Sequence, residues 1–184
     1  MMKILAFGAS TSSKSINKRL AHYTAGLFND FEVTAIDLRD YELPLYSEDY
    51  ENDKGFPENA RRFHELIKNH DGIIISLAEH NSNVTAAYKN LEDWASRFEG
   101  STWRDRKVFL LSTSNGKRGG AGALKLTRDI MPWRGGNVVA HFSLPEFSQN
   151  FSDNDGIHDE DLKSQYLEQV DAFRKALHEN QDKS

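Results

Sequence analysis

The sequence predicts an α/β protein built on a parallel, doubly wound β-sheet. Its most strand-like stretch is 72–77, a continuous β-branched and apolar run, typical of a parallel strand buried on both faces. Polar or small residues follow, and from Val84 onward apolar residues recur at spacings of three and four, as in an amphipathic helix. Similar successions recur along the 184 residues, so that five strands alternate with five helices. This alternation is typical of parallel sheets with right-handed crossovers and helices on both faces.

The elements follow from local patterns. A first strand over 3–8 leads through a hydroxyl-rich loop into a helix over 16–27, for which Ser15 is well placed as the N-cap. The segment 32–38 alternates as a second strand, and the acidic stretch 48–53 is expected to be a solvated loop. The remaining predicted strands are 72–77, 108–111 and 137–142, and the remaining predicted helices are 58–69, 84–95, 123–131 and 159–177.

Length and composition limit the class of protein. One domain over 1–184 is expected, with the residues from 178 onward frayed. The net charge of −5 argues against a non-specific nucleic-acid binder, and no apolar run approaches the roughly 18 residues of a membrane span. The N-terminus is too short for a signal peptide, so a cytoplasmic location is expected. The sequence has no cysteine, which excludes disulfides and thiolate chemistry.

The loop 10–17 is a candidate anion site. It joins a strand to a helix N-terminus, where backbone N–H groups point outward and the helix dipole favours negative charge. Its serine and threonine hydroxyls add further donors. The alternative, an ordinary N-cap with a serine-rich turn, stays equally open on the residues alone.

Three loops carry a resemblance to a known family. The segment 77–94 reads LAEHNSNVTAAYKNLEDW, and it resembles the pattern PEYNxSIPxxLKNxxDW of the NAD(P)H-dependent FMN reductases. The chain departs from that pattern at Ala78, His80 and Thr85. The family's GSxRxxSxN is matched at Ser10, Ser15 and Asn17, with Ser12 at the usual arginine and Lys14 nearby as a substitute charge. The family's SxSxGxxGG is matched at Ser112, Ser114, Gly116, Gly119 and Gly120.

The resemblance implies a flavodoxin-like, three-layer αβα sandwich with strand order 2-1-3-4-5. In that order the loops after the first and third strands meet at the switch point of the sheet. The implied cofactor is FMN, with NADPH or NADH as co-substrate and a small flavin, quinone, azo compound or metal oxyanion as acceptor. The implied cofactor-binding residues are Ser10, Ser12, Ser15, Ile16, Asn17, Ala78, Glu79, His80, Asn81, Ser82, Ser112, Ser114 and Gly116.

The resemblance also implies a homodimer or homotetramer, for which Tyr88 and Trp94 are candidate interface anchors. An alternative is that both belong to the core of the chain. No catalytic side chain is nominated, because the cofactor carries the chemistry. The histidines show no metal-binding spacing, so no metal site is expected. Glu92 and Asp93 are interpreted as part of a helix face.

Two other functions remain open on the sequence. One is a flavodoxin-like electron carrier or ligand-binding module, for which the acidic charge would suit docking on a basic partner. The other is a family member with weakened FMN binding, which the departures at Ser12, Ala78 and His80 motivate.

Overall fold

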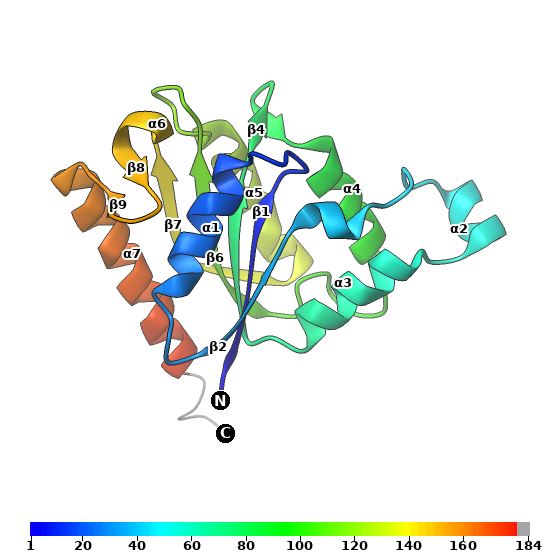
Figure 1. Ribbon diagram of the computed structural model, residues 1–184. Coiled ribbons are helices and arrows are strands. Elements are labelled where there is room, and N and C mark those ends of the chain that lie inside the picture. Colours follow the sequence, from blue (N-terminus) through cyan, green and yellow to red (C-terminus); the bar gives the residue numbers. More distant parts are fainter. Residues whose placement is uncertain (180–184) are drawn as a thin grey trace.

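The computed structural model describes residues 1–179 and shows a five-stranded parallel sheet between two layers of helices (Figure 1). The strands lie in the order β2-β1-β3-β6-β7. This confirms the predicted order, with the fourth and fifth predicted strands numbered β6 and β7. The strand bounds are Lys3–Ala9 for β1, Glu32–Ile36 for β2, Gly72–Leu77 for β3, Arg106–Thr113 for β6 and Gly136–Leu144 for β7.

Two separate clusters of buried side chains hold the layers together. On β1, Ile4 and Ala6 belong to one cluster, whereas Leu5 and Phe7 belong to the other, as the two-residue period of a strand requires. The first cluster packs under α1 (Ile16–Gly26) and α7 (Glu160–His178). The second packs under α3 (Glu58–Lys68), α4 (Ala86–Ala95) and α5 (Ala121–Ile130). Since both faces are covered, the middle of each central strand is apolar, as in 73–75 of β3 and 108–111 of β6.

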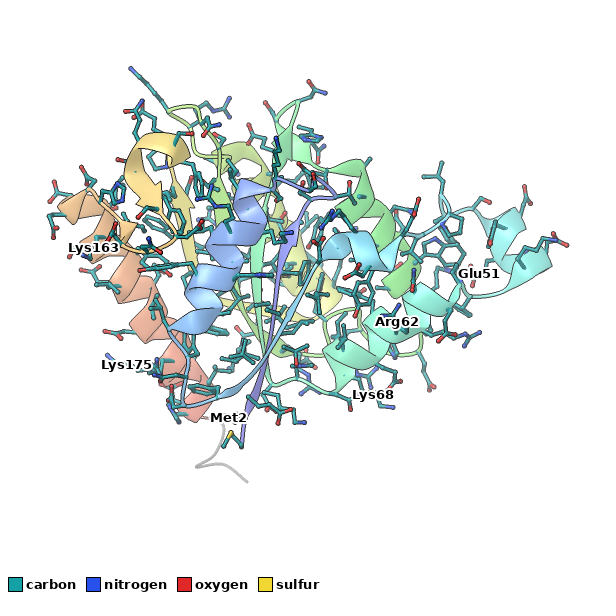
Figure 2. The ribbon with its side chains drawn as sticks, in the orientation of Figure 1. Met2, Glu51, Arg62, Lys68, Lys163 and Lys175 are labelled. Atoms are coloured by element: carbon teal, nitrogen blue, oxygen red, sulfur yellow. The ribbon has the colours of Figure 1, made fainter. Side chains whose placement is uncertain are left out.

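Charged side chains lie at the periphery of these layers (Figure 2). Figure 2 shows the side chains filling the space between sheet and helices, with labelled residues such as Glu51, Lys68 and Lys163 at the periphery. Within residues 1–179, no helix combines the length and the apolar character needed to cross a membrane. His178 is still helical, and the fraying expected beyond it concerns mainly residues 180–184, which lie outside the described part of the chain.

The structure corrects several local predictions. The acidic segment forms a helix, α2 (Glu48–Lys54), because Ser47 caps it by accepting from the Tyr50 N–H and its first-turn carboxylates suit the helix dipole. Strand β2 ends at Ile36, because Asp37 caps a 3₁₀ helix that begins at the next residue. Helix α4 begins only at Ala86, because Thr85 is its N-cap. The C-terminal connection adds a short α6 (Phe147–Asn150) and a hairpin of β8 (Phe151–Ser152) and β9 (Gly156–Ile157).

The residues on the buried face of α4 do not have the roles that the sequence suggested. Tyr88 and Trp94 are fully buried within the chain, so they are core residues rather than exposed interface anchors. Glu92 is only 2% exposed instead of lying on a solvated helix face. Its carboxylate accepts a hydrogen bond from Trp103 Nε1 at 3.3 Å and lies 3.5 Å from Arg134 Nη1. Burial raises the pKa of Glu92, while Arg134 and Trp103 partly oppose that shift.

Candidate functional site

The loops after β1, β3 and β6 meet at the carboxyl edge of the sheet and line an open cavity of about 320 Å³. The convergence expected from the strand order is therefore present, at the position where open α/β sheets bind ligands. The lining residues are Ser10, Ser12, Lys14, Ser15, Ile16, Asn17, Ala78, Glu79, His80, Thr113, Ser114 and Asn115.

Most of the predicted site residues line this cavity, and four do not. Asn81 and Ser82 form the tip of a turn, Gly116 lies farther along its loop, and Ser112 is fully buried. The sequence reasoning missed Thr113 and Asn115. The only signal for them was their position directly beside Ser112 and Ser114 at the end of a strand.

Asn17 ties the three loops together. Its side chain is buried and donates from Nδ2 to the Thr113 carbonyl at 3.1 Å. Its Oδ1 accepts from the Thr113 N–H at 3.0 Å and from Ser76 Oγ at 2.8 Å. Asn17 therefore links the first turn of α1 to the ends of β3 and β6. Its side chain fixes the shape of the cavity, and its predicted contact with a phosphate stays a prediction.

The β1–α1 loop is folded by its own serines. Ser10 Oγ accepts from the Ser12 N–H, Ser12 Oγ from the Lys14 N–H and Ser15 Oγ from the Lys18 N–H, at 3.1 to 3.3 Å. A hydroxyl that accepts in this way retains its own proton as a donor. None of these three protons has an acceptor among the described residues, so the loop offers three hydroxyl donors beside a helix N-terminus.

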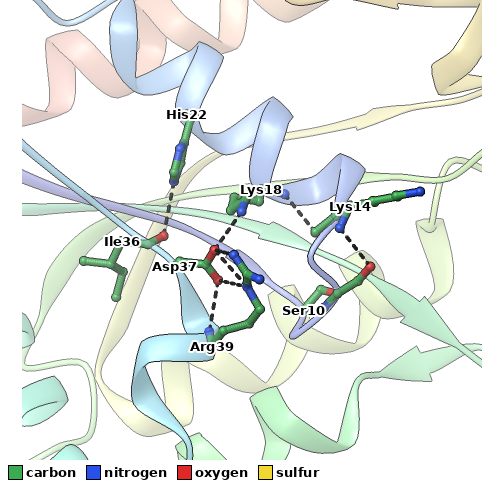
Figure 3. A network of polar contacts seen from close by, with 9 residues as sticks. Ser10, Lys14, Lys18, His22, Ile36, Asp37 and Arg39 are labelled. Atoms are coloured by element: carbon green, nitrogen blue, oxygen red, sulfur yellow. Dashed lines mark hydrogen bonds and ion pairs between the residues drawn. The ribbon is translucent and has the colours of Figure 1, made fainter.

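One carboxylate determines which cations near this loop are free (Figure 3). Asp37 accepts from Lys18 Nζ at 2.7 Å and from Arg39 through both Nε and Nη2. These contacts, with Arg39 the larger contributor, hold the pKa of Asp37 well below its usual value. Within residues 1–179, Lys14 has no carboxylate within 4.0 Å. Lys14 is therefore the cation available to an anion in the cavity.

The segment expected to be a plain loop after β3 is a small hairpin. β4 (Glu79–His80) pairs antiparallel with β5 (Asn83–Val84). The two turn residues, Asn81 and Ser82, have φ values of 54° and 62°, as a two-residue hairpin of the primed type requires. The sequence did not reveal the hairpin, because a serine occupies a position where glycine is the usual signal. Such a backbone costs a non-glycine residue roughly 1–2 kcal/mol, so other contacts must hold it.

The loop after β6 is held in place from several sides. The Ser114 carbonyl accepts from the Phe147 N–H at 3.0 Å, and the Gly116 carbonyl accepts from the Glu146 N–H at 3.1 Å. Ser112 Oγ donates to the Gly119 carbonyl at 2.8 Å. Ser112 thus supports the loop from below, whereas Ser114 reaches the cavity.

The strand order and the site at its switch point define a flavodoxin-like protein. Residues 2–149 match the family described as NADPH-dependent FMN reductase. The chain belongs to that family, as its loops suggested, and is an oxidoreductase that uses FMN and NAD(P)H.

Individual relatives agree with this assignment. The chain is 39% identical over 131 residues to a 2-hydroxy-1,4-benzoquinone reductase of Burkholderia sp, covering 70% of this chain and 69% of that one. It is 31% identical over 106 residues to a quinone reductase of Escherichia coli K12, covering 58% of this chain and 55% of that relative. The flavoenzyme NAD(P)H:(acceptor) oxidoreductase FerB of Paracoccus denitrificans has the same fold, with a TM-score of 0.78 at 22% identity over 97% of this chain and 98% of that one.

The residues present fit FMN. The three free hydroxyl protons, the N-terminus of α1 and Lys14 provide donors and one positive charge for a phosphate. Ser12 stands where the family pattern has an arginine. Lys14 supplies a positive charge in the same loop, without the bidentate geometry of a guanidinium.

Proposed function

We propose that FMN binds in the cavity formed by the loops after β1, β3 and β6. Its phosphate would lie at Ser10, Ser12, Lys14 and Ser15, and its ring beside the segment 78–80 and Ser114. The convergence of these loops, with three free hydroxyl protons and a cation contributed by the loop after β1, is the observation that carries the proposal. The predicted contacts from Asn81, Ser82, Ser112 and Gly116 would be indirect, because these residues do not line the cavity.

A small quinone is the proposed electron acceptor. When bound, FMN would supply the redox chemistry that carries electrons from NAD(P)H to the acceptor. The chain's own part is to hold the phosphate and to present a wall of small side chains and backbone at Ala78 and Ser114. The names of the two relatives above, both quinone reductases, support a quinone over the other acceptors expected from the sequence.

The reaction is tested by mixing FMN-loaded protein with NADPH or NADH in the absence of oxygen. We expect the flavin absorption to bleach in proportion to the nicotinamide oxidised, and a benzoquinone added afterwards to restore it. Steady-state kinetics should then be ping-pong, with parallel double-reciprocal lines, since one open face would serve donor and acceptor in turn. FMN that stays oxidised for minutes with both nucleotides would favour the carrier or binding-module alternative.

We also propose that the chain forms a homodimer or homotetramer. With Tyr88 and Trp94 buried, the proposal rests on the family resemblance, because a single exposed apolar side chain is ordinary on a protein surface. Leu45, which is 81% exposed beside the aromatic pair Tyr46 and Trp94, is the position at which the assembly is tested. Light scattering at micromolar concentration should give at least twice the 21.0 kDa of one chain. Leu45→Glu should shift the mass toward a monomer, and a monomeric wild type would contradict the proposal.

The single domain over 1–184 and the cytoplasmic location remain predictions.

A further inference from the structure

Helix α5 begins without a cap of its own. It follows Gly120, which has a φ of 77° and no side chain to accept from the first turn. The N–H of Ala123, in that first turn, instead donates to Glu79 Oε2 at 2.9 Å. Glu79 lies in β4, 44 residues earlier in the chain. Its carboxylate thus does what an N-cap side chain does, and its negative charge suits the helix N-terminus.

The contact is tight as well as polar. A Cβ atom at Gly122 would stand 2.6 Å from Glu79 Oε2 and 3.2 Å from the Ser82 carbonyl oxygen. An alanine at this position would push the Glu79 carboxylate aside and would crowd the Ser82 carbonyl, so glycine gives the β4–β5 hairpin its close approach to the first turn of α5. Glu79 and Gly122 are the two sides of one contact.

The hairpin needs such a contact. Its ladder contains only two residue pairs, and its turn is held at positive φ. Even longer two-stranded hairpins are only marginally stable in water when they are isolated. At the base of the hairpin, Thr85 Oγ1 donates to the Ala9 carbonyl at 2.9 Å and fixes it to the end of β1. The bond from Ala123 to Glu79 fixes it to α5 on the other side.

We propose that Glu79 is a positioning residue, which fixes the hairpin wall of the FMN cavity by capping α5 from outside that helix. The proposal rests on the FMN site described above. Loss of the acceptor oxygen frees Ala78 and His80 to move. FMN affinity then falls because the backbone of the hairpin wall has shifted, without a direct contact between Glu79 and FMN. Glu79→Gln retains an acceptor oxygen and tests position separately from charge.

The first measurement is FMN affinity, by titration of flavin fluorescence. Glu79→Ala should weaken binding by about tenfold or more, the scale of one hydrogen bond to a charged group. Gly122→Ala should weaken binding in the same direction but less, because the Glu79 carboxylate can turn away from the added methyl group. Glu79→Gln should remain within about threefold of wild type, because the amide oxygen still accepts from Ala123. The second measurement is hydrogen exchange of the FMN-free protein, in which amides of 79–84 should exchange faster in the two weakened variants.

Asp159→Ala is the matched control. It removes the N-cap of α7, where Asp159 Oδ1 accepts from the Leu162 N–H at 2.9 Å, far along the chain from the hairpin. It should lower the melting temperature about as much as Glu79→Ala. FMN affinity and hairpin exchange should not change.

Two outcomes would overturn the proposal. In the first, Glu79→Ala behaves like Asp159→Ala, with a lower melting temperature but unchanged FMN affinity and hairpin exchange, which is the signature of an ordinary cap. In the second, Glu79→Gln loses as much affinity as Glu79→Ala, which shows that the carboxylate acts through its charge. A wild-type protein that fails to bind FMN would contradict the cofactor site instead, and hydrogen exchange would still decide the positioning role.

Discussion

Asn17→Ala should destabilise the protein by about 3 kcal/mol and weaken FMN binding at the same time. The substitution removes three hydrogen bonds, which join Asn17 to Ser76 Oγ and to both backbone groups of Thr113. Each such bond contributes about 1 kcal/mol net, and a buried partner left without a bond costs more. Ser76 is fully buried and Thr113 nearly so, so water cannot replace the lost partner.

Chemical denaturation of the FMN-free protein measures this effect. Asn115→Ala is the control, because Asn115 lines the same cavity but is exposed, and among the described residues its side chain bonds only to Ser148. It should cost less than about 1 kcal/mol, as most surface substitutions do. Asn17→Asp should be as damaging as alanine, since a carboxylate cannot donate to the Thr113 carbonyl. A loss below about 1 kcal/mol for Asn17→Ala would show that the three loops are held together by other contacts.

The fold was largely predictable because its signals are local and repeated. The apolar run 72–77, buried on both faces, and the spacing on α4 follow directly from covering a parallel sheet with helices. The strand order rested on the family resemblance, since periodicity does not reveal which strands pair. Helix α2 was missed because its sequence is acidic and its residues are not buried, so there was no apolar stripe to detect.

The candidate site was predictable by position and less so by role. The family motifs identified the loops, and nine of the thirteen predicted residues line the cavity. Motifs do not show which way a side chain faces. Asn17 and Ser112 match as well as Ser10 does, yet their side chains donate within the protein, whereas the Ser10 hydroxyl proton has no acceptor among the described residues. The buried state of Glu92 depends on Trp103 and Arg134, which contact it only after folding.

The second large effect is expected from the charge of the β1–α1 loop, where the FMN phosphate is proposed to bind. Lys14→Gln should weaken FMN binding about tenfold and reduce its dependence on salt, because Lys14 is the cation of this loop that no described carboxylate neutralises. Ser12→Arg should tighten FMN by roughly 1–3 kcal/mol, the scale of hydrogen bonds to a charged group. With both substitutions together, the arginine should offset the loss of the lysine, and affinity should return to near the wild-type value.

Lys18→Gln is the matched control for these titrations. Lys18 carries the same charge in the first turns of α1, but it is paired with Asp37, which Arg39 continues to hold after the substitution. FMN affinity should therefore stay within about twofold of wild type, as expected for a cation whose charge is already balanced. If Lys18→Gln weakens FMN while Lys14→Gln and Ser12→Arg leave it unchanged, the phosphate lies nearer the Asp37 network. The serine protons at the start of α1 would then serve another ligand.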